Sequence, residues 1–415
     1  MSAGQQNGMG AAFNSYTNDS TFMAAMQDAG AEAGHARKQP VGNCPHILMM
    51  GARSSGKTSI QRVVFNKTSP HETLFLDATQ SLDRKHICNN DFINFEIWDF
   101  PGNYDVKEEL VSGGTIYDEQ MIFGNCGALL YVIDAQDEPY TEAVTNLLDT
   151  VAKAHTINPK IEVEVFIHKV DGDSFVSDVL KMDCNQKIQK AINEQLGDNE
   201  LGLDLRFYLT SIYDHSIFEA FSKVVQRMIP CLPTLENLLN CLIGTCAMEK
   251  AFLFDVISKI YVATDSNPVD IPTYELCSDM IDVVIDISCI YGSNSDDGND
   301  SFLSYNERSS SVIRLTGGMF TGQVLYLREV NSFLALVCLV REENFKKQGL
   351  IDYNIDSFKG ALSEVIQISK LTALRKAGLA SSLGNTRRTA GGSSGGGGAR
   401  ASEANGSNSR ARPEQ

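Results

Sequence analysis

Short apolar runs alternate with helix-like stretches between residues 45 and 232. The apolar runs, which we interpret as strands, are 46–50, 92–98, 128–133, 163–167 and 205–209. Helical periodicity follows most of them, for instance at 58–65 and 140–154. Strands that alternate with helices predict the α/β fold class, with a doubly wound, mostly parallel sheet. Residues 92–98 instead alternate apolar and polar side chains, so we expect an antiparallel edge strand there.

A different pattern begins after Pro230 and Pro233, which mark the end of the first region. Helices are predicted at 235–246, 272–285 and 352–369. Strands are predicted at 251–264, 312–315, 324–328 and 333–340. An antiparallel sheet with few helices is an α+β pattern. This region carries no obvious catalytic signature.

The pattern divides the chain into four parts. Residues 1–43 are rich in Gly, Ala, Gln and Asn without sustained periodicity, so we expect a disordered N-terminal arm. The two folded domains are predicted at 44–232 and 233–370. Residues 371–415 contain a run of Gly and Ser and are predicted to be a flexible tail.

Composition narrows the functional classes. The net charge of −17 argues against nucleic acid as the main partner, because such binding depends on neutralising phosphates. The ten cysteines show no zinc-ligand spacing, and a reducing cytosolic setting fits them. We see no apolar run long enough to span a bilayer, no signal peptide and no lipidation motif. We therefore expect no direct membrane insertion, and any membrane attachment to come from a partner.

Residues 51–58 read Gly-Ala-Arg-Ser-Ser-Gly-Lys-Thr, the pattern of a phosphate-binding P-loop between a strand and a helix. Glycines 51 and 56 let backbone N–H groups approach phosphate oxygens. Lys57 is expected to reach the β- and γ-phosphates, and the Thr58 hydroxyl to bind Mg²⁺. Chance occurrence is the alternative, and the strand–loop–helix context argues against it. The residues expected to line the phosphates are Arg53, Ser54, Ser55, Gly56, Lys57, Thr58 and Ser59.

A second signal is the tetrapeptide Asp99-Phe100-Pro101-Gly102, which follows a predicted strand. Asp99 at the strand end can hold a magnesium-bound water, and the Gly102 N–H can contact a γ-phosphate. Alone, the tetrapeptide could be an ordinary turn. Its strand is expected to lie beside the P-loop strand, which favours the metal-binding interpretation.

A third signal predicts guanine recognition. Asp171, in His168-Lys169-Val170-Asp171, can accept hydrogen bonds from N1–H and the exocyclic amine of guanine together, a donor pair that adenine lacks. The Lys169 stem can cover the base. His168 stands where most GTPases have Asn. Ser211 and Ile212, after the next strand, could offer a backbone N–H to the base oxygen.

With these motifs in place, the sequence resembles a Rag GTPase, on the branch called RagC/RagD in animals and Gtr2 in yeast. The resemblance covers about residues 44–370. The stretches that carry it are 71–76 (HETLFL), 97–102 (IWDFPG), 128–136 (ALLYVIDAQ), 164–172 (EVFIHKVDG), 207–224 (FYLTSIYDHSIFEAFSKV), 233–239, 251–265 and 349–354.

The resemblance implies a Ras-like P-loop GTPase domain followed by a Roadblock/longin-type domain, with GTP/GDP and Mg²⁺ as ligands. It implies a heterodimer with a RagA/RagB-like GTPase through residues 233–370. It also implies a Ragulator-like Roadblock scaffold, activating and exchange proteins, and a signal of amino-acid sufficiency to the TOR kinase complex, given by this subunit when GDP-bound. The implied location is the cytoplasm, with recruitment to the lysosomal or vacuolar surface, and the nucleus as a further compartment.

Some positions depart from the family or leave alternatives open. Asn103 stands where many GTPases have a water-positioning Gln, and Arg53 where fast relatives prefer Gly, so we expect slow hydrolysis that depends on an activating protein. The loop after Asn103 is longer than in relatives. Thr79 matches the family's magnesium-binding switch threonine, and Thr73 is a second candidate for nucleotide contact. Either could instead be a solvated loop hydroxyl.

Three functions remain open at this point: a regulatory Rag-type GTPase, a GTP-binding adaptor with negligible turnover, and a Ras-like GTPase of a trafficking pathway. The adaptor is favoured by Asn103. A trafficking GTPase would carry a lipid anchor or an amphipathic N-terminal helix, and no Roadblock domain.

Overall fold

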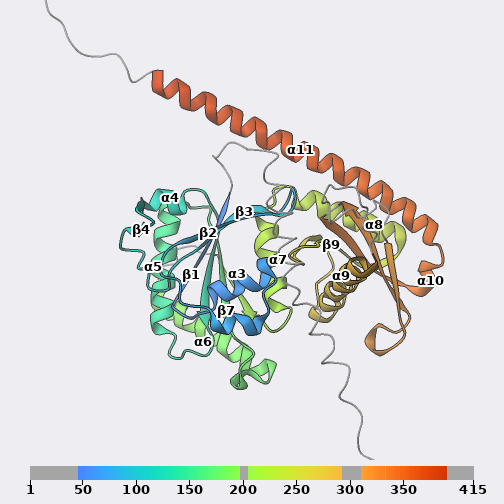
Figure 1. Ribbon diagram of the computed structural model, residues 1–415, viewed down its shortest axis with the longest axis horizontal. Helices are drawn as coiled ribbons and strands as arrows, with labels where there is room; N and C mark the ends of the chain where they lie inside the picture. The colour runs from blue at the N-terminus through green and yellow to red at the C-terminus, as the bar shows by residue number, and fades with distance from the viewer. Residues whose placement is uncertain (1–44, 197–203, 292–309, 332, 390–415) are drawn as a thin grey trace, which may run out of the picture. The chain divides into compact units, whose positions relative to one another are not determined.

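The computed structural model describes residues 45–196, 204–291, 310–331 and 333–389 (Figure 1). The first part of the chain contains, in order, β1 (His46–Gly51), α3 (Lys57–Asn66), η2 (Pro70–Phe75), β2 (Asp83–Cys88), β3 (Asn94–Asp99), β4 (Leu110–Ser112), β5 (Thr115–Tyr117), α4 (Glu119–Phe123), β6 (Cys126–Asp134), α5 (Thr141–Ile157), β7 (Glu162–His168), η3 (Asp173–Phe175), α6 (Asp178–Leu196), β8 (Leu205–Thr210) and α7 (Ser216–Arg227).

Six strands of this part form one sheet in the order β2-β3-β1-β6-β7-β8. All neighbours are parallel except β2 and β3. Alternate residues of β1 face different cores: Ile47 and Met49 pack on the side of α3 and α7, whereas Leu48 and Met50 pack on the side of α5 and α6. Burial of each contributes roughly 1.5–3 kcal/mol. The doubly wound α/β sheet predicted from the sequence is thus confirmed.

The prediction that residues 92–98 form an antiparallel edge strand is wrong. β3 lies between β1 and β2, with Met49 opposite Asp99, so it is beside the P-loop strand as expected, but parallel to it. The antiparallel edge is β2, which the sequence pattern missed. Its sequence, DRKHIC, is polar, and Ile87 is its one buried residue, so no apolar run marks it.

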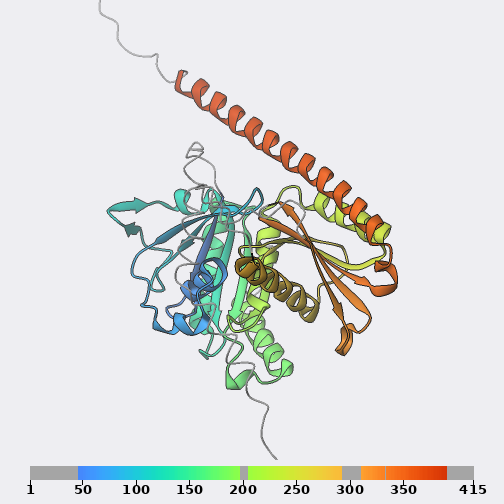
Figure 2. The same cartoon turned by 45° about the vertical axis from the view of Figure 1, so that its right-hand side comes forward.

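The second domain contains α8 (Leu232–Cys246), β9 (Met248–Asp255), β10 (Tyr261–Thr264), α9 (Ile271–Tyr291), β11 (Ser310–Leu315), η4 (Gly318–Phe320), β12 (Gln323–Asn331), β13 (Leu334–Arg341), α10 (Glu342–Phe345) and the start of α11 (Gln348–Thr389). Its five strands form an antiparallel sheet in the order β10-β9-β13-β12-β11. α9 packs on one face, and α8 with the first turns of α11 on the other (Figures 1 and 2).

Two predicted elements of this domain need correction. The single strand at 251–264 is wrong, because the chain turns between β9 and β10, where Lys259 has a positive φ of 59°. Helix α11 runs to Thr389, past the predicted end at 369 and into the expected tail. Residues 371–377, LTALRKA, are mostly strong helix formers, which accounts for the extension. The predicted N-terminal arm and the Gly/Ser run lie outside the described residues.

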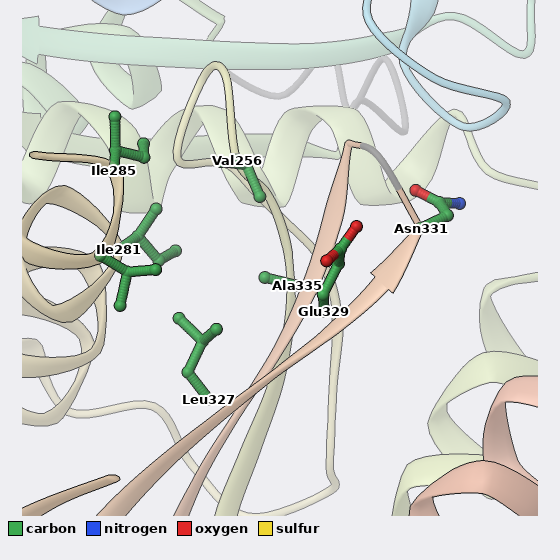
Figure 3. Close-up of a pocket in the computed structure, with 8 residues that line it drawn as sticks. Val256, Ile281, Ile285, Leu327, Glu329, Asn331 and Ala335 are labelled. Carbon is green, nitrogen blue, oxygen red and sulfur yellow. The ribbon is translucent and has the colours of Figure 1, made fainter. Parts of the chain in front are cut away.

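A small cavity of about 30 Å³ lies between α9 and the sheet (Figure 3). Ile281, Ile285, Leu327 and Ala335 are among the residues that line it, and Glu329 lies at one side. It has room for about one water molecule. In the described part of the chain, no helix is long and apolar enough to cross a membrane.

Candidate functional site

The loop between β1 and α3 adopts a conformation that requires glycine at two positions. Gly51 and Gly56 have φ values of +137° and +103°. A Cβ on Gly51 would lie 2.2 Å from the carbonyl oxygen of Val132, and one on Gly56 would lie 2.5 Å from Cδ2 of His168. The loop therefore packs tightly on β6 and β7, and it leads into the N-terminus of α3, where an anion is favoured.

Lys57 holds this loop in shape from the first turn of α3. Its ammonium group donates to the carbonyl oxygens of Gly51 and Ala52, at 2.8 Å each. Burial lowers the pKa of Lys57 to about 8, against the opposing influence of Asp99. The Lys57 ammonium group is thus held at the P-loop and partly desolvated, and a phosphate at this position would stabilise its charge.

Thr58, Thr79 and Asp99 come together although they lie on different segments. The Thr58 hydroxyl donates to Asp99 Oδ2 at 2.5 Å and lies 2.8 Å from the Thr79 hydroxyl. Thr79 Oγ1 lies 3.5 Å from Asp99 Oδ2. Asp99 is fully buried, and burial is the largest cause that raises its pKa. The structure thus brings the three predicted metal ligands to one point.

This cluster fits Mg²⁺. Its donors are two hydroxyls and a carboxylate, the oxygen ligands that Mg²⁺ prefers. Asp99 Oδ1 is buried and has no hydrogen-bond partner among the described residues, so it has an unused lone pair. The described ranges contain no group of three His, Cys, Asp or Glu side chains that could hold a metal. Water and the oxygens of a bound phosphate would supply the remaining ligands, because Mg²⁺ usually keeps several waters in its coordination sphere.

Gly102 and Asn103 lie in the loop that follows β3. A Cβ on Gly102 would lie 2.3 Å from Cα of Arg53, so the two loops touch backbone to backbone. The side chains of Arg53 and Asn103 are exposed. The longer loop expected after Asn103 forms a hairpin, β4–β5, whose Tyr117 ring packs on Trp98 at 5.9 Å.

His168 is the last residue of β7. It is buried behind the P-loop, with its ring against Gly56 and Nδ1 3.0 Å from the Thr210 hydroxyl. Burial, with help from Lys169, lowers its pKa to about 4, so the ring is neutral at physiological pH. His168 therefore supports the loop from behind.

Lys169 and Asp171 lie at the carboxyl end of β7. Lys169 Nζ donates to the Ser54 carbonyl at 2.7 Å and to Asp134 at 2.6 Å, so its stem crosses from β7 to the P-loop. The Ser211 hydroxyl donates to Asp171 Oδ1 at 2.6 Å and orients the carboxylate. The backbone N–H of Ser211 donates to Ser216, which leaves Ile212 as the candidate donor to a base oxygen.

The remaining predicted residues divide into two groups. The first group lies in the P-loop or at the start of α3 and consists of Ser54, whose φ is 61°, Ser55 and Ser59. The buried Ser55 hydroxyl has no partner in the described structure. Thr73 lies apart from the cluster in η2, where its hydroxyl donates to the Pro70 carbonyl at 2.7 Å. The sequence reading missed Asp134, which is visible only as the last residue of an apolar strand.

The comparisons with known proteins agree with this geometry. The family described as "Gtr1/RagA G protein conserved region" matches residues 46–281. Ras-related GTP-binding protein C of Homo sapiens is 55% identical over 335 residues, 80% of this chain and 79% of that protein. GTP-binding protein gtr2 of Schizosaccharomyces pombe is 51% identical, over 77% of this chain and 97% of that protein.

The similarity extends to a more distant relative. GTP-binding protein GTR2 of Saccharomyces cerevisiae is 43% identical over 331 residues, 77% of this chain and 92% of that protein. The matches span the P-loop, the Asp99 motif and the Asp171 motif, as well as much of the second domain. The chain therefore belongs to the Gtr/Rag family of GTP-binding proteins, on the branch of Gtr2 and RagC/RagD.

Proposed function

We propose that this protein is a guanine-nucleotide switch that binds GTP or GDP with Mg²⁺ and hydrolyses GTP slowly. The observation that carries the proposal is the convergence of Thr58, Thr79 and Asp99 beside the P-loop lysine. The Asp171–Ser211 pair lies at the same carboxyl edge of the sheet, where α/β folds bind nucleotides.

Each residue has a distinct task in this proposal. When a nucleotide binds, the Lys57 ammonium group leaves the two loop carbonyls and donates to phosphate oxygens instead. Asp171 selects guanine by accepting hydrogen bonds from N1–H and the exocyclic amine of the base. Mg²⁺, when bound, neutralises phosphate charge. Thr79 belongs to the segment before β2 and Gly102 to the segment after β3, so a γ-phosphate contacted by both would order both segments.

Slow hydrolysis follows from Asn103. Its side chain is exposed, and it is one methylene shorter than the glutamine that positions water in many GTPases. Single-turnover hydrolysis of GTP by the purified chain tests this point. We expect a rate far below 1 s⁻¹ that an activating protein increases. A rate of order 1 s⁻¹ without a partner would refute slow turnover, and no turnover with any activator would favour the adaptor role.

We further propose that residues 233–370 form a Roadblock/longin-type domain that pairs with a RagA/RagB-like GTPase. β11 is at the end of the strand order, and one of its edges has no neighbouring strand among the described residues, so a partner strand could pair there. On α9, Val283 and Ile287 are 40% and 50% exposed. Because apolar residues of both domains share one core, point changes test this interface better than deletion of the domain.

The interface test uses a double variant, Val283→Glu with Ile287→Glu, and Leu350→Glu as a control at an exposed apolar position elsewhere in the domain. Co-purification with a RagA/RagB-like chain should be lost in the double variant and kept in the control. Retained pairing in the double variant would contradict the interface.

In a cell, this proposal places the pair with a Ragulator-like scaffold, exchange and activating proteins and the TOR kinase complex, at the lysosomal or vacuolar surface. It is supported by the family to which the chain belongs. Attachment there would come from partners.

A further inference from the structure

Asp255, the last residue of β9, is a fully buried carboxylate held by donors from both domains. Within its own domain, Ser258 donates its backbone N–H at 2.8 Å and its hydroxyl at 2.5 Å to Oδ2. From the β2–β3 turn, Asn89 Nδ2 donates to Oδ2 at 2.8 Å and Asn90 Nδ2 donates to Oδ1 at 2.7 Å. Half of the donors to this anion therefore belong to the nucleotide-binding domain.

The orientation of the Asn90 amide is fixed from its other side. Its Oδ1 accepts the backbone N–H groups of Phe92 at 2.8 Å and Ile93 at 3.0 Å. Because the oxygen is needed there, the nitrogen must face Asp255. Ile93 is fully buried, which ties the turn to the core of the sheet.

The β2–β3 hairpin connects this contact with the magnesium cluster. Next to the turn, Cys88 is opposite Asn94, and at the far end Asp83 is opposite Asp99. Thr79 lies just before β2. A pair of six-residue strands spans about 20 Å. The hairpin is thus a short, hydrogen-bonded body with Asp255 at one end and Asp99 at the other.

A purely local role does not account for the two asparagines. Ser258 alone would shape the β9–β10 turn, and the junction between the domains already has an apolar core in which Phe221 and Ile260 share one cluster. A buried carboxylate that loses half of its donors is strongly disfavoured. Bonds of 2.7–2.8 Å are broken by a shift of about 1 Å. The contact is therefore sensitive to the position of the hairpin.

We propose that Asp255 is a positioning residue for the nucleotide site. Through Asn89 and Asn90 it fixes the β2–β3 hairpin, and with it Asp99 and Thr79 against Thr58. The inference rests on the proposed function, since Mg²⁺ and nucleotide are what the hairpin helps to hold. Coupling is reciprocal, so the nucleotide must in turn change the stability of the β9–β10 turn.

The first test uses the variant Asn90→Asp in the full chain. The new carboxylate still accepts from Phe92 and Ile93, but it opposes Asp255 with a like charge. We expect release of fluorescent GDP in Mg²⁺ to accelerate by at least about fivefold, the lower end of usual coupling. Release in excess EDTA should not change, because the effect acts through the metal position.

Two further variants complete this test. Asn90→Asp combined with Asp255→Asn exchanges donor and acceptor across the contact, and it should restore release in Mg²⁺ toward the wild-type rate. Asn344→Asp makes the same charge change at a partly exposed site whose amide donates to the Ala247 carbonyl, and it should have no effect.

The second test needs no variant. Hydrogen exchange at residues 255–260 of the wild-type chain should differ by at least about fivefold between the Mg²⁺ complexes of GDP and of a non-hydrolysable GTP analogue. A structural tether alone would give equal exchange. Equal exchange, or wild-type release by Asn90→Asp, would overturn the inference while the proposed function stands. Failure of the wild-type chain to retain GDP would instead refute the proposed function.

Discussion

Replacement of Gly102 by alanine should separate recognition of the triphosphate from binding of the diphosphate. A Cβ at this position would lie 2.3 Å from Cα and 2.4 Å from the backbone nitrogen of Arg53. Carbon atoms pack at about 3.5 Å, so one of the two loops must retreat by at least about 1 Å. The P-loop packs tightly on β6 at Gly51 and on β7 at Gly56, so we expect the Gly102 loop to move.

This displacement takes the Gly102 N–H away from a γ-phosphate. A misplacement of about 1 Å can lower a rate by roughly 100-fold, which corresponds to about 2.7 kcal/mol of activation free energy. We therefore expect single-turnover GTP hydrolysis to fall by about that factor, with or without an activating protein, while GDP dissociation changes little.

A matched control is Gly244→Ala in helix α8, where an added Cβ meets nothing within 4 Å. The control should keep wild-type hydrolysis, because a helical Gly→Ala change favours the fold. Wild-type hydrolysis in Gly102→Ala would refute the argument, since it would mean that the close approach to Arg53 has no role in catalysis.

Three other changes have defined outcomes. Asp99→Asn should weaken Mg²⁺-dependent retention of GDP by about 10- to 100-fold, measured by magnesium titration of nucleotide release, and an unchanged titration would exclude Asp99 from the metal site. Asn103→Gln should raise intrinsic hydrolysis by about tenfold, because the longer amide reaches further, and single-turnover kinetics would show it. His168 has its pKa lowered to about 4 by burial, so the unfolded chain takes up the proton first as the pH falls. The neutral, buried His168 ring therefore contributes at most about 3 kcal/mol to the free energy of unfolding above pH 6.5, and this contribution is lost between pH 6.5 and 4. Melting curves of His168→Asn should show a weaker pH dependence over that range, and an identical one would contradict the burial argument.

Local motifs in the sequence indicate most of the candidate nucleotide site, because a P-loop and an Asp at the end of a buried strand are each recognised from neighbouring residues alone. The α/β pattern is equally local. The sequence pattern did not predict β2, because an exposed edge strand has no apolar run to mark it. The sequence pattern did not predict the β9–β10 turn, because its two polar residues lie between two mostly apolar stretches, 251–257 and 260–263.

Contacts between distant segments could not be predicted from the pattern. The packing of His168 on Gly56 depends on the distance between β7 and the P-loop, which spacing along the chain does not give. The same holds for Asp255, whose partners Asn89 and Asn90 precede it by more than 160 residues. Its buried charge is understandable only after the domains are placed together.

Competition binding to nucleotide-free chain, with GDP, ADP and xanthosine diphosphate, tests the central claim most directly. A site built around paired donors of guanine should prefer GDP over ADP by at least about 1000-fold. Asp171→Asn should weaken GDP and favour the xanthine nucleotide, because its amide can donate to the carbonyl that replaces the exocyclic amine of guanine. Equal binding of GDP and ADP, or an Asp171→Asn variant with unchanged base preference, would contradict the account.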